Sequence, residues 1–296
     1  MSDLNYEYPP INTLTGTAAH YFTIPKCIIE GTELDYRRVS LFVYLRCYKG
    51  LNDHLCFSVP LFLKWANLKN DTHPDGVNEK IITLLDSLND FGYITYCSDR
   101  AESRTFCIDI LFNSQQVFDE CAIERFAIVY IDEVEKIMQY KNLNPKDSYF
   151  NCNAVLLVFA YLRMAIARRP NKLKPEERFP KEIKERRERL PEAYNDTYKD
   201  IAATLGLSVR AVSKAVDVLK ELGLIHVREA YHIKNELDEY RTPDMIFANM
   251  QKRDKNYLLI EGVEYANSEV ENKAKLINKH NKKYVLKGDK QNDIYR

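Results

Sequence analysis

The part of the sequence that most limits the fold is residues 197–225, TYKDIAATLGLSVRAVSKAVDVLKELGLI. Thr197 is followed three residues later by Asp200, a weaker form of the capping box that begins a helix. Gly206 can adopt the left-handed conformation that ends a helix in a sharp turn, and Ser208 then offers an N-cap for a second helix. The spacing therefore predicts a short helix, a tight turn and a longer helix.

Both predicted helices have one apolar face, as a pair of packed helices requires. In the first helix this face consists of Ile201, Ala202 and Leu205. The second helix is expected to bury Val209, Val212, Val216, Leu219 and Leu222. Its opposite face carries Arg210, Ser213, Lys214 and Asp217.

This segment resembles the helix-turn-helix of winged-helix DNA-binding proteins in the small residue Ala202, the turn glycine Gly206 and the apolar Val212. The run HVREAYHI that follows is expected to frame a wing through Val227 and Ile233. In that family the second helix reads the major groove and the wing lies along phosphates. The resemblance implies base contacts from Ser208, Arg210, Ser213 and Lys214, phosphate contacts from Arg228 and Lys234, and further DNA contacts from Thr197 and Lys199. A winged helix that packs only against protein is the alternative.

A second copy of the pattern lies upstream. Residues 85–94, LDSLNDFGYI, align without gaps on residues 216–225, VDVLKELGLI. Each copy is preceded by a long apolar helix containing Tyr-Leu-Arg, at residues 44–46 and 161–163, and by a strand-like run, YFTIP at 21–25 and IVYID at 128–132. The repeated order predicts a mainly α fold with small β-wings, built as two tandem winged helix-turn-helix domains.

The two copies differ in charge. In the first, the helix in the recognition position, residues 77–90, exposes Glu79, Asp86 and Asp90 against Lys80, and such a face repels phosphates. Residues 71–135 contain fourteen acidic against four basic residues. This half suits a protein partner or a basic segment of a second copy of the chain; a solvated acidic face is the alternative.

The second copy contains a basic insertion between its first helix and its helix-turn-helix. Residues 163–190 carry eleven Lys or Arg and five Glu, and three prolines prevent one continuous helix. Such a segment can lie along the DNA backbone or remain a solvated loop. The phosphate candidates are Arg163, Arg168, Arg169, Lys172 and Lys174.

The predicted organisation is a flexible leader at 1–20, a first domain at 21–125, a second domain at 126–264 with the insertion at 163–195, and a C-terminal helix with a basic tail at 265–296. Further expected elements are helices at 34–49, 132–140 and 150–167, a turn-rich connection at 67–76 and a wing at 96–112. The C-terminal helix is expected either to pair two protomers or to dock on its own domain.

Whole-chain composition limits the class of protein. The net charge is zero, with 43 basic and 43 acidic residues, so affinity for nucleic acid has to come from uneven distribution. Absence of a long apolar run or a signal peptide predicts a cytoplasmic protein with no membrane contact. The seven cysteines form no C-x-x-C pair, which argues against a zinc ribbon or a disulfide framework, and most are expected in the core.

Catalytic motifs are absent from the sequence. It has no Gly-x-Gly-x-x-Gly, no Walker-type loop and no Gly-x-Ser-x-Gly elbow, and its six histidines are not clustered at ligand spacing. We therefore expect no enzyme activity, no catalytic or metal-binding residues and no cofactor.

As a whole, the chain resembles the tandem winged-helix replication initiators and regulators of phages, plasmids and integrative elements of Gram-positive bacteria. The resemblance spans roughly residues 20–280 and implies sequence-specific binding to double-stranded DNA by a dimer, in replication initiation or transcription control. The alternative is a protein-interaction adaptor, of the replisome-loading type, whose winged helices bind protein partners.

Overall fold

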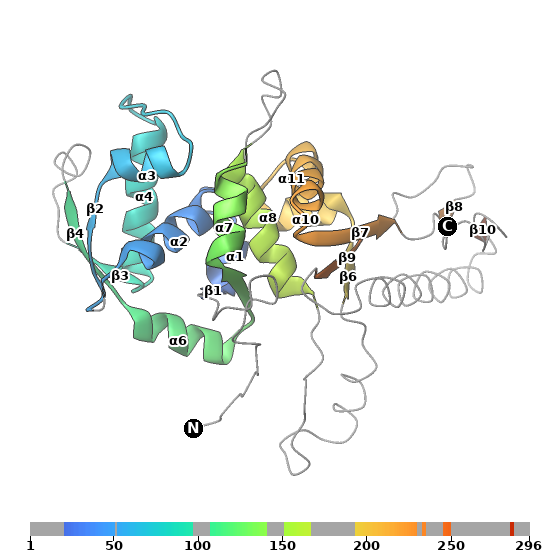
Figure 1. Ribbon diagram of the computed structural model, residues 1–296, viewed down its shortest axis with the longest axis horizontal. Helices are drawn as coiled ribbons and strands as arrows, with labels where there is room; N and C mark the ends of the chain where they lie inside the picture. Colours follow the sequence, from blue (N-terminus) through green and yellow to red (C-terminus); the bar gives the residue numbers. More distant parts are fainter. Residues whose placement is uncertain are drawn as a thin grey trace, which may run out of the picture. The chain divides into compact units, whose positions relative to one another are not determined.

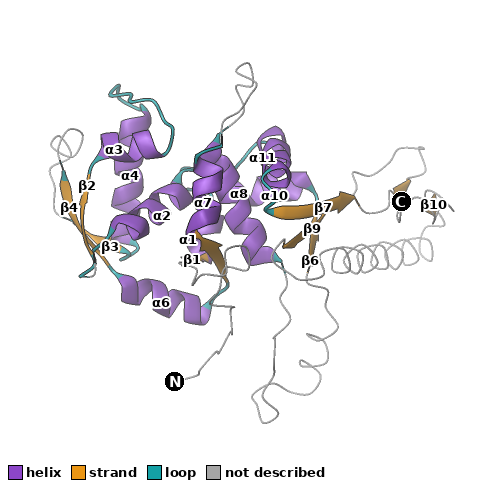
Figure 2. Cartoon of the chain, viewed as in Figure 1, coloured by secondary structure: helices purple, strands orange, loops and turns teal. Residues whose placement is uncertain are grey.

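The computed structural model describes residues 21–50, 52–96, 107–140, 151–166, 193–229, 233–234, 245–249 and 285–286. In these residues the chain is mainly helical, with small antiparallel sheets of two or three strands (Figures 1 and 2). This confirms the prediction of a mainly α fold with small β elements. The described residues up to Ala165 cluster with Ile201–Leu222 in one compact unit, and those of Ile166–Asp200 and from Gly223 onward cluster in a second.

The first half of the chain contains a three-stranded sheet in the order β2-β4-β3. The helix α4 has the predicted bounds. Strand β4 lies within the predicted wing at 96–112, but its partner β3 precedes this range. In chain order the elements are β1 (Tyr21–Pro25), α1 (Lys26–Glu30), α2 (Arg38–Tyr48), β2 (His54–Phe57), α3 (Val59–Trp65), α4 (Val77–Asp90), β3 (Ile94–Thr95), β4 (Ile108–Phe112) and α6 (Ser114–Ile123).

From its first strand to the strand after its second helix pair, the second half has the same order of elements, and its three-stranded sheet, β6-β9-β7, again has the last strand in the middle. Two very short strands, β8 and β10, pair with each other. In chain order the elements are β5 (Phe126–Tyr130), α7 (Ile131–Met138), α8 (Cys152–Ala165), β6 (Ala193–Asp196), α10 (Tyr198–Leu205), α11 (Val209–Glu221), β7 (Ile225–Glu229), β8 (Ile233–Lys234), β9 (Met245–Asn249) and β10 (Val285–Leu286).

Matching glycines end the two longer helices of the repeat. Gly92, after α4, has φ 75° and Gly223, after α11, has φ 67°. Both lie in the left-handed region, where a side chain costs energy and glycine does not. The turn sends the chain directly into β3 or β7, so the aligned segments 85–94 and 216–225 have the same backbone course.

Two predictions about local structure were wrong. The helix predicted at 34–49 begins at Arg38, because the Asp35 carboxylate accepts a hydrogen bond from the backbone N–H of Arg37 at 3.0 Å and holds the preceding residues in a turn. Val227 and Ile233 do not frame one short wing, because β7 pairs along its whole length with β9, which sets Val227 opposite Phe247. Ile233 belongs to β8, which pairs with β10.

Strands β1 and β5, which begin the two halves, pair with each other. Their antiparallel register is centred on Thr23 and Ile128, which are the middle residues of the two strands. The halves are thus joined about a local two-fold relation, and the pairing crosses the domain boundary predicted between residues 125 and 126.

Helix α8 is the most buried helix of the described chain, with Cys152 to Met164 all inside. Near its end, Arg163 is only 3% exposed and forms an ion pair with Glu133 of α7. The same carboxylate accepts a hydrogen bond from the backbone N–H of Tyr130 at 3.0 Å. Arg163 is therefore a structural residue of the core, and its assignment as a phosphate contact was wrong.

A second buried cation, Arg38 of α2, is 1% exposed and donates to backbone carbonyls. Its Nε and Nη2 donate to Ile28 and Ile29 of α1 at 2.8 and 2.7 Å. Its Nη1 donates to Leu34 at 3.1 Å, and Nη2 also reaches Leu205, the last residue of α10, at 3.4 Å. Burial lowers the pKa of Arg38 to about 10, so the guanidinium is still charged at neutral pH.

We predict that Arg38→Met lowers the free energy of unfolding by about 3 kcal/mol, because several buried carbonyl oxygens lose a charged donor. Urea denaturation of the full chain measures this loss. Lys26→Met is the matched control, since the Lys26–Glu30 pair lies at the surface and contributes little. Equal effects of the two substitutions would contradict the assigned role of Arg38.

Candidate nucleic-acid interface

The helix pair α10–α11 has the tight turn that the sequence predicts. Gly206 has φ 68°, and the backbone N–H of Leu207 donates to the carbonyl of Ala202 at 2.9 Å. The Ser208 hydroxyl accepts from the N–H of Ala211 at 3.1 Å and caps α11. The left-handed glycine and the serine cap together bring the chain from one helix into the next within three residues.

The buried face of α11 differs slightly from the predicted stripe. Val212, Val216 and Leu219 are buried as expected, but Val209 is 48% exposed and Leu222 is half-buried. Ala215 and Val218 are buried in addition. The reason is position: Val209 is the first residue of the helix and Leu222 follows its last, so neither lies over the centre of the contact.

The opposite face of α11 presents polar and cationic residues. Arg210, Asp217 and Lys220 are exposed, while Ser213 and Lys214 are half-buried. These residues recur at intervals of three and four along the helix, so they form one stripe. The predicted base-contact residues Ser208, Arg210, Ser213 and Lys214 therefore lie on the first two turns of one helix.

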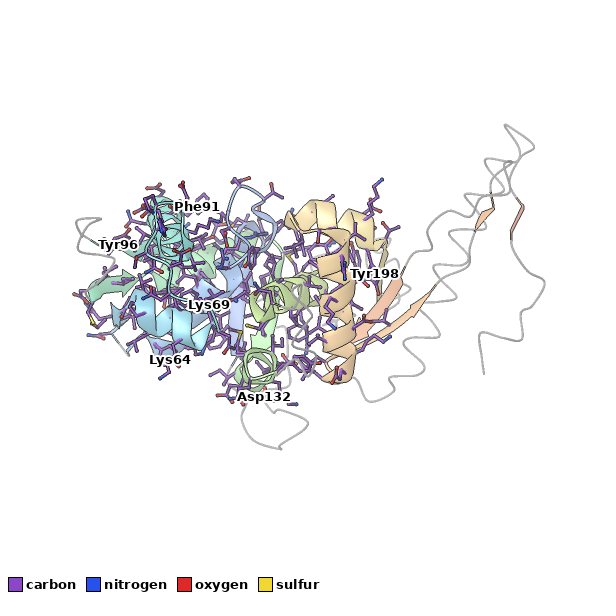
Figure 3. All side chains as sticks on the ribbon, turned by 90° about the horizontal axis from the view of Figure 1, so that it is seen from above. Lys64, Lys69, Phe91, Tyr96, Asp132 and Tyr198 are labelled. Atoms are coloured by element: carbon purple, nitrogen blue, oxygen red, sulfur yellow. The ribbon has the colours of Figure 1, made fainter. Side chains whose placement is uncertain are left out.

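Thr197, predicted to contact DNA, is buried, and its hydroxyl caps α10 at the position predicted from the sequence. The hydroxyl accepts from the backbone N–H of Asp200 at 3.1 Å and donates to the Asp200 carboxylate at 2.5 Å. Its own N–H donates to Asp196 at 2.8 Å. Thr197 is thus a structural residue, whereas Lys199 in the same turn is exposed. Figure 3 labels Tyr198, which stands between them at the start of α10.

The remaining predicted contacts belong to strands of the second half and to the insertion. Arg228 belongs to β7 and Lys234 to β8, and only the backbone of these strands is described at the two positions. Arg168, Arg169, Lys172 and Lys174 of the insertion lie outside the described residues.

The corresponding helix of the first half, α4, has an acidic outer face. Continuing the gap-free alignment upstream sets Glu79 against Arg210 and Thr83 against Lys214. Asp86 accepts a hydrogen bond from the Tyr96 hydroxyl at 2.5 Å, so this carboxylate is tied to the start of the wing. Lys80 and Asp90 are exposed. The structure thus keeps the framework of the helix pair in both halves and reverses the charge at the leading position.

The turn between α3 and α4 is long, as predicted, and is closed by buried Asn78. Its side-chain oxygen accepts from the backbone N–H of Asp71 at 3.0 Å, and its amide donates to Asn70 at 2.8 Å. Gly76 is needed here, since an added Cβ would lie 2.7 Å from the Asp71 carbonyl oxygen. Lys64, near the end of α3, and Lys69, in the turn itself, are both exposed (Figure 3).

Sequence reasoning missed two hydrogen bonds that link the α10–α11 pair to distant residues. At the surface, Glu221 in the last turn of α11 accepts from the Tyr140 hydroxyl at 2.6 Å, and this bond raises the pKa of Tyr140 to about 12. The end of α10 is held by Arg38. The only hint of the role of Arg38 was a single arginine at the start of an apolar helix. Its hydrogen-bond partners are backbone carbonyls, which no sequence pattern identifies.

None of the helices in the described part of the chain has the length and apolarity needed to cross a bilayer. In the same residues, no group of three or more His, Cys, Asp or Glu side chains is arranged to hold a metal ion. Comparison with protein-family models gives no match, and comparison with curated proteins gives no significant match.

We predict that Thr197→Ala lowers the free energy of unfolding by about 1 kcal/mol, the usual effect of removing an N-cap hydroxyl. Chemical denaturation provides the measurement. Lys199→Ala is the control in the same turn and is expected to leave stability nearly unchanged, because its side chain is exposed. An unaltered stability for Thr197→Ala would show that the cap is dispensable.

Proposed function

We propose that this chain is a sequence-specific double-stranded DNA-binding protein and that α11 is its reading helix. The main support for the proposal is the outer face of α11. There Arg210 and Lys214 are grouped with Ser208 and Ser213, at the start of a helix that follows a tight turn. A helix of this width enters a major groove, where Arg pairs with guanine and Ser contacts several bases.

We further propose that both halves are winged helices. The support is their common order of helix, strand, helix, helix, strand, strand and the common position of the last strand in the middle of each sheet. In this proposal Lys199, Arg228 and Lys234, together with the insertion residues Arg168, Arg169 and Lys172, contact phosphates. No cofactor or metal takes part.

The proposed biological role is replication initiation or transcription control on a mobile genetic element, as the resemblance implies. Of the two helices in the recognition position, α4 is acidic and α11 cationic on the outer face, so one chain offers one reading helix. A homodimer would present two, about 34 Å apart for adjacent turns of one face of the duplex.

The second candidate is a protein-interaction adaptor. It is favoured by the acidic outer face of α4 and by two exposed apolar residues of α6, Phe118 at 68% and Ile123 at 84% exposed. Such a surface suits a protein partner better than a phosphate backbone. The two functions are compatible if the first half binds protein and the second half binds DNA. A chain that is only an adaptor would show no salt-dependent binding to duplex DNA.

We predict that the double substitution Arg210→Ala, Lys214→Ala lowers affinity at least about 100-fold for a duplex selected by the wild-type chain from a random library. Fluorescence anisotropy measures the affinity, and circular dichroism tests whether the fold is intact. The matched control, Lys69→Ala with Lys80→Ala, removes two exposed cations from the first half and should change affinity less than about threefold. Unchanged affinity in the α11 variant would exclude α11 as the reading helix.

A separate prediction concerns the insertion. Replacing Arg168, Arg169 and Lys172 by Ala should weaken binding to all duplexes alike and reduce the slope of log affinity against log salt by roughly one for each phosphate that the variant no longer neutralises. The measurement is a salt titration with the selected duplex and a scrambled one. A slope equal to that of the wild-type chain would mean that the insertion does not touch phosphates.

A further inference from the structure

The solvent face of the first three-stranded sheet carries a pair of thiols. Along β2 the side chains alternate, so that Cys56 points outward and Phe57 inward. Along β4 the same alternation buries Ile108 and Ile110 and exposes Asp109. Cys107 stands immediately before β4 and is also exposed. The antiparallel register sets Cys56 directly opposite Asp109, which leaves Cys107 as its diagonal neighbour.

The two thiols are close enough to affect each other, since Cys107 is the largest cause of the raised pKa of Cys56. Next to them, the Nδ1 atom of His54 lies 3.6 Å from an Asp109 carboxylate oxygen. The expectation of core cysteines fits Cys152, which is buried, but is wrong for this pair, because both residues occupy outward positions of the pleat.

We propose that Cys56 and Cys107 form an intramolecular disulfide in exchange with a low-molecular-weight disulfide such as oxidised glutathione. One protein thiolate attacks a sulfur of oxidised glutathione, the glutathione S–S bond breaks, and a first glutathione thiolate leaves. The second protein thiolate then attacks the protein sulfur of this mixed disulfide and releases the second glutathione thiolate. Two protein thiols are oxidised, one glutathione disulfide is reduced, and the two thiol protons end on the two released glutathiones.

The surroundings of the pair set the pH at which the exchange is fast. Hydrogen bonding with Cys107, slight desolvation and the negative charges of Cys107 and Asp109 raise the pKa of the exposed Cys56 thiol. The thiolate is the attacking species, so a raised pKa slows the reaction near neutral pH and the rate increases as the pH rises. The groups that face Cys56 are His54 on its own strand and Cys107 and Asp109 on β4.

The bond would fasten β2 to β4 and close a chain loop that contains α3, α4 and β3. Such a loop is long, and cross-linking a long loop reduces the conformational freedom of the unfolded chain. The first half would therefore become harder to unfold, without any change to the outer face of α11. This inference is independent of the proposed DNA binding.

The test uses the full chain in glutathione redox buffers at pH 8, followed by alkylation, digestion without reduction and peptide mapping by mass spectrometry. We expect a peptide pair joined through Cys56 and Cys107, whose fraction rises with the ratio of oxidised to reduced glutathione. The melting temperature should rise by roughly 5 °C when the bond forms and fall back on reduction.

Single variants sharpen the test. Cys107→Ser should leave Cys56 joined to one glutathione, Cys56→Ser should do the same for Cys107, and both should lack the rise in melting temperature. The control Cys47→Ser should keep the bond, because Cys47 lies half-buried in α2, away from the pair in the sheet. Two separately glutathionylated residues in the wild-type chain, or a dominant bond from either residue to Cys97, would overturn the proposal.

Discussion

One buried charge links three segments of the first compact unit. Arg38 has no carboxylate within bonding distance among its described partners; it is held by carbonyl oxygens at the end of α1, in the following turn and at the end of α10. The C-terminal end of a helix carries unsatisfied carbonyl oxygens and a partial negative charge. A guanidinium that donates to two such ends replaces the water molecules that these carbonyls would otherwise bind. Leu205 directly precedes the turn glycine Gly206. A side chain at Gly206 would lie next to the carbonyl oxygen of Thr32. Arg38 thus ties the end of α10, just before the turn into α11, to α1 and the turn that follows it.

The repeat explains why the two halves are alike inside and different outside. The antiparallel pairing of β1 with β5 relates the halves locally, and the left-handed glycines Gly92 and Gly223 end equivalent helices. These features are demanded by backbone geometry and packing, which both halves need in order to fold. Backbone geometry and packing do not constrain the outer positions in this way. At one of them α4 has Glu79 where α11 has Arg210. The two halves therefore share a framework but differ in the charge of this outer position. A cationic face attracts phosphates, and an acidic face repels them.

Local rules allowed the sequence to predict the elements whose causes are local. The cap at Thr197, the turn at Gly206, the cap at Ser208 and the bounds of α4 all depend on residues within one helical turn of each other. Contacts between distant residues were not predictable in the same way. The partner of β7 is β9, beyond an intervening short strand, and Arg163 looked like part of a basic run although its partner Glu133 lies thirty residues earlier. Arg38 donates to backbone carbonyls, which every residue possesses, so no pattern of side chains marks them.

Electrostatics gives the proposed DNA complex a single orientation. The chain as a whole carries no net charge, so it gains little from long-range attraction, and its acidic and basic regions act separately. At physiological salt, charges more than about 8 Å apart are largely screened, and each face is sensed only where it approaches the duplex. A phosphate backbone near α4 meets Glu79 and Asp90 with Lys80 as their counter-charge, whereas near the start of α11 it meets Arg210 and Lys214. In the proposed complex, approach by α11 is then the favourable one, because the acidic face of α4 gains nothing from contact with phosphates.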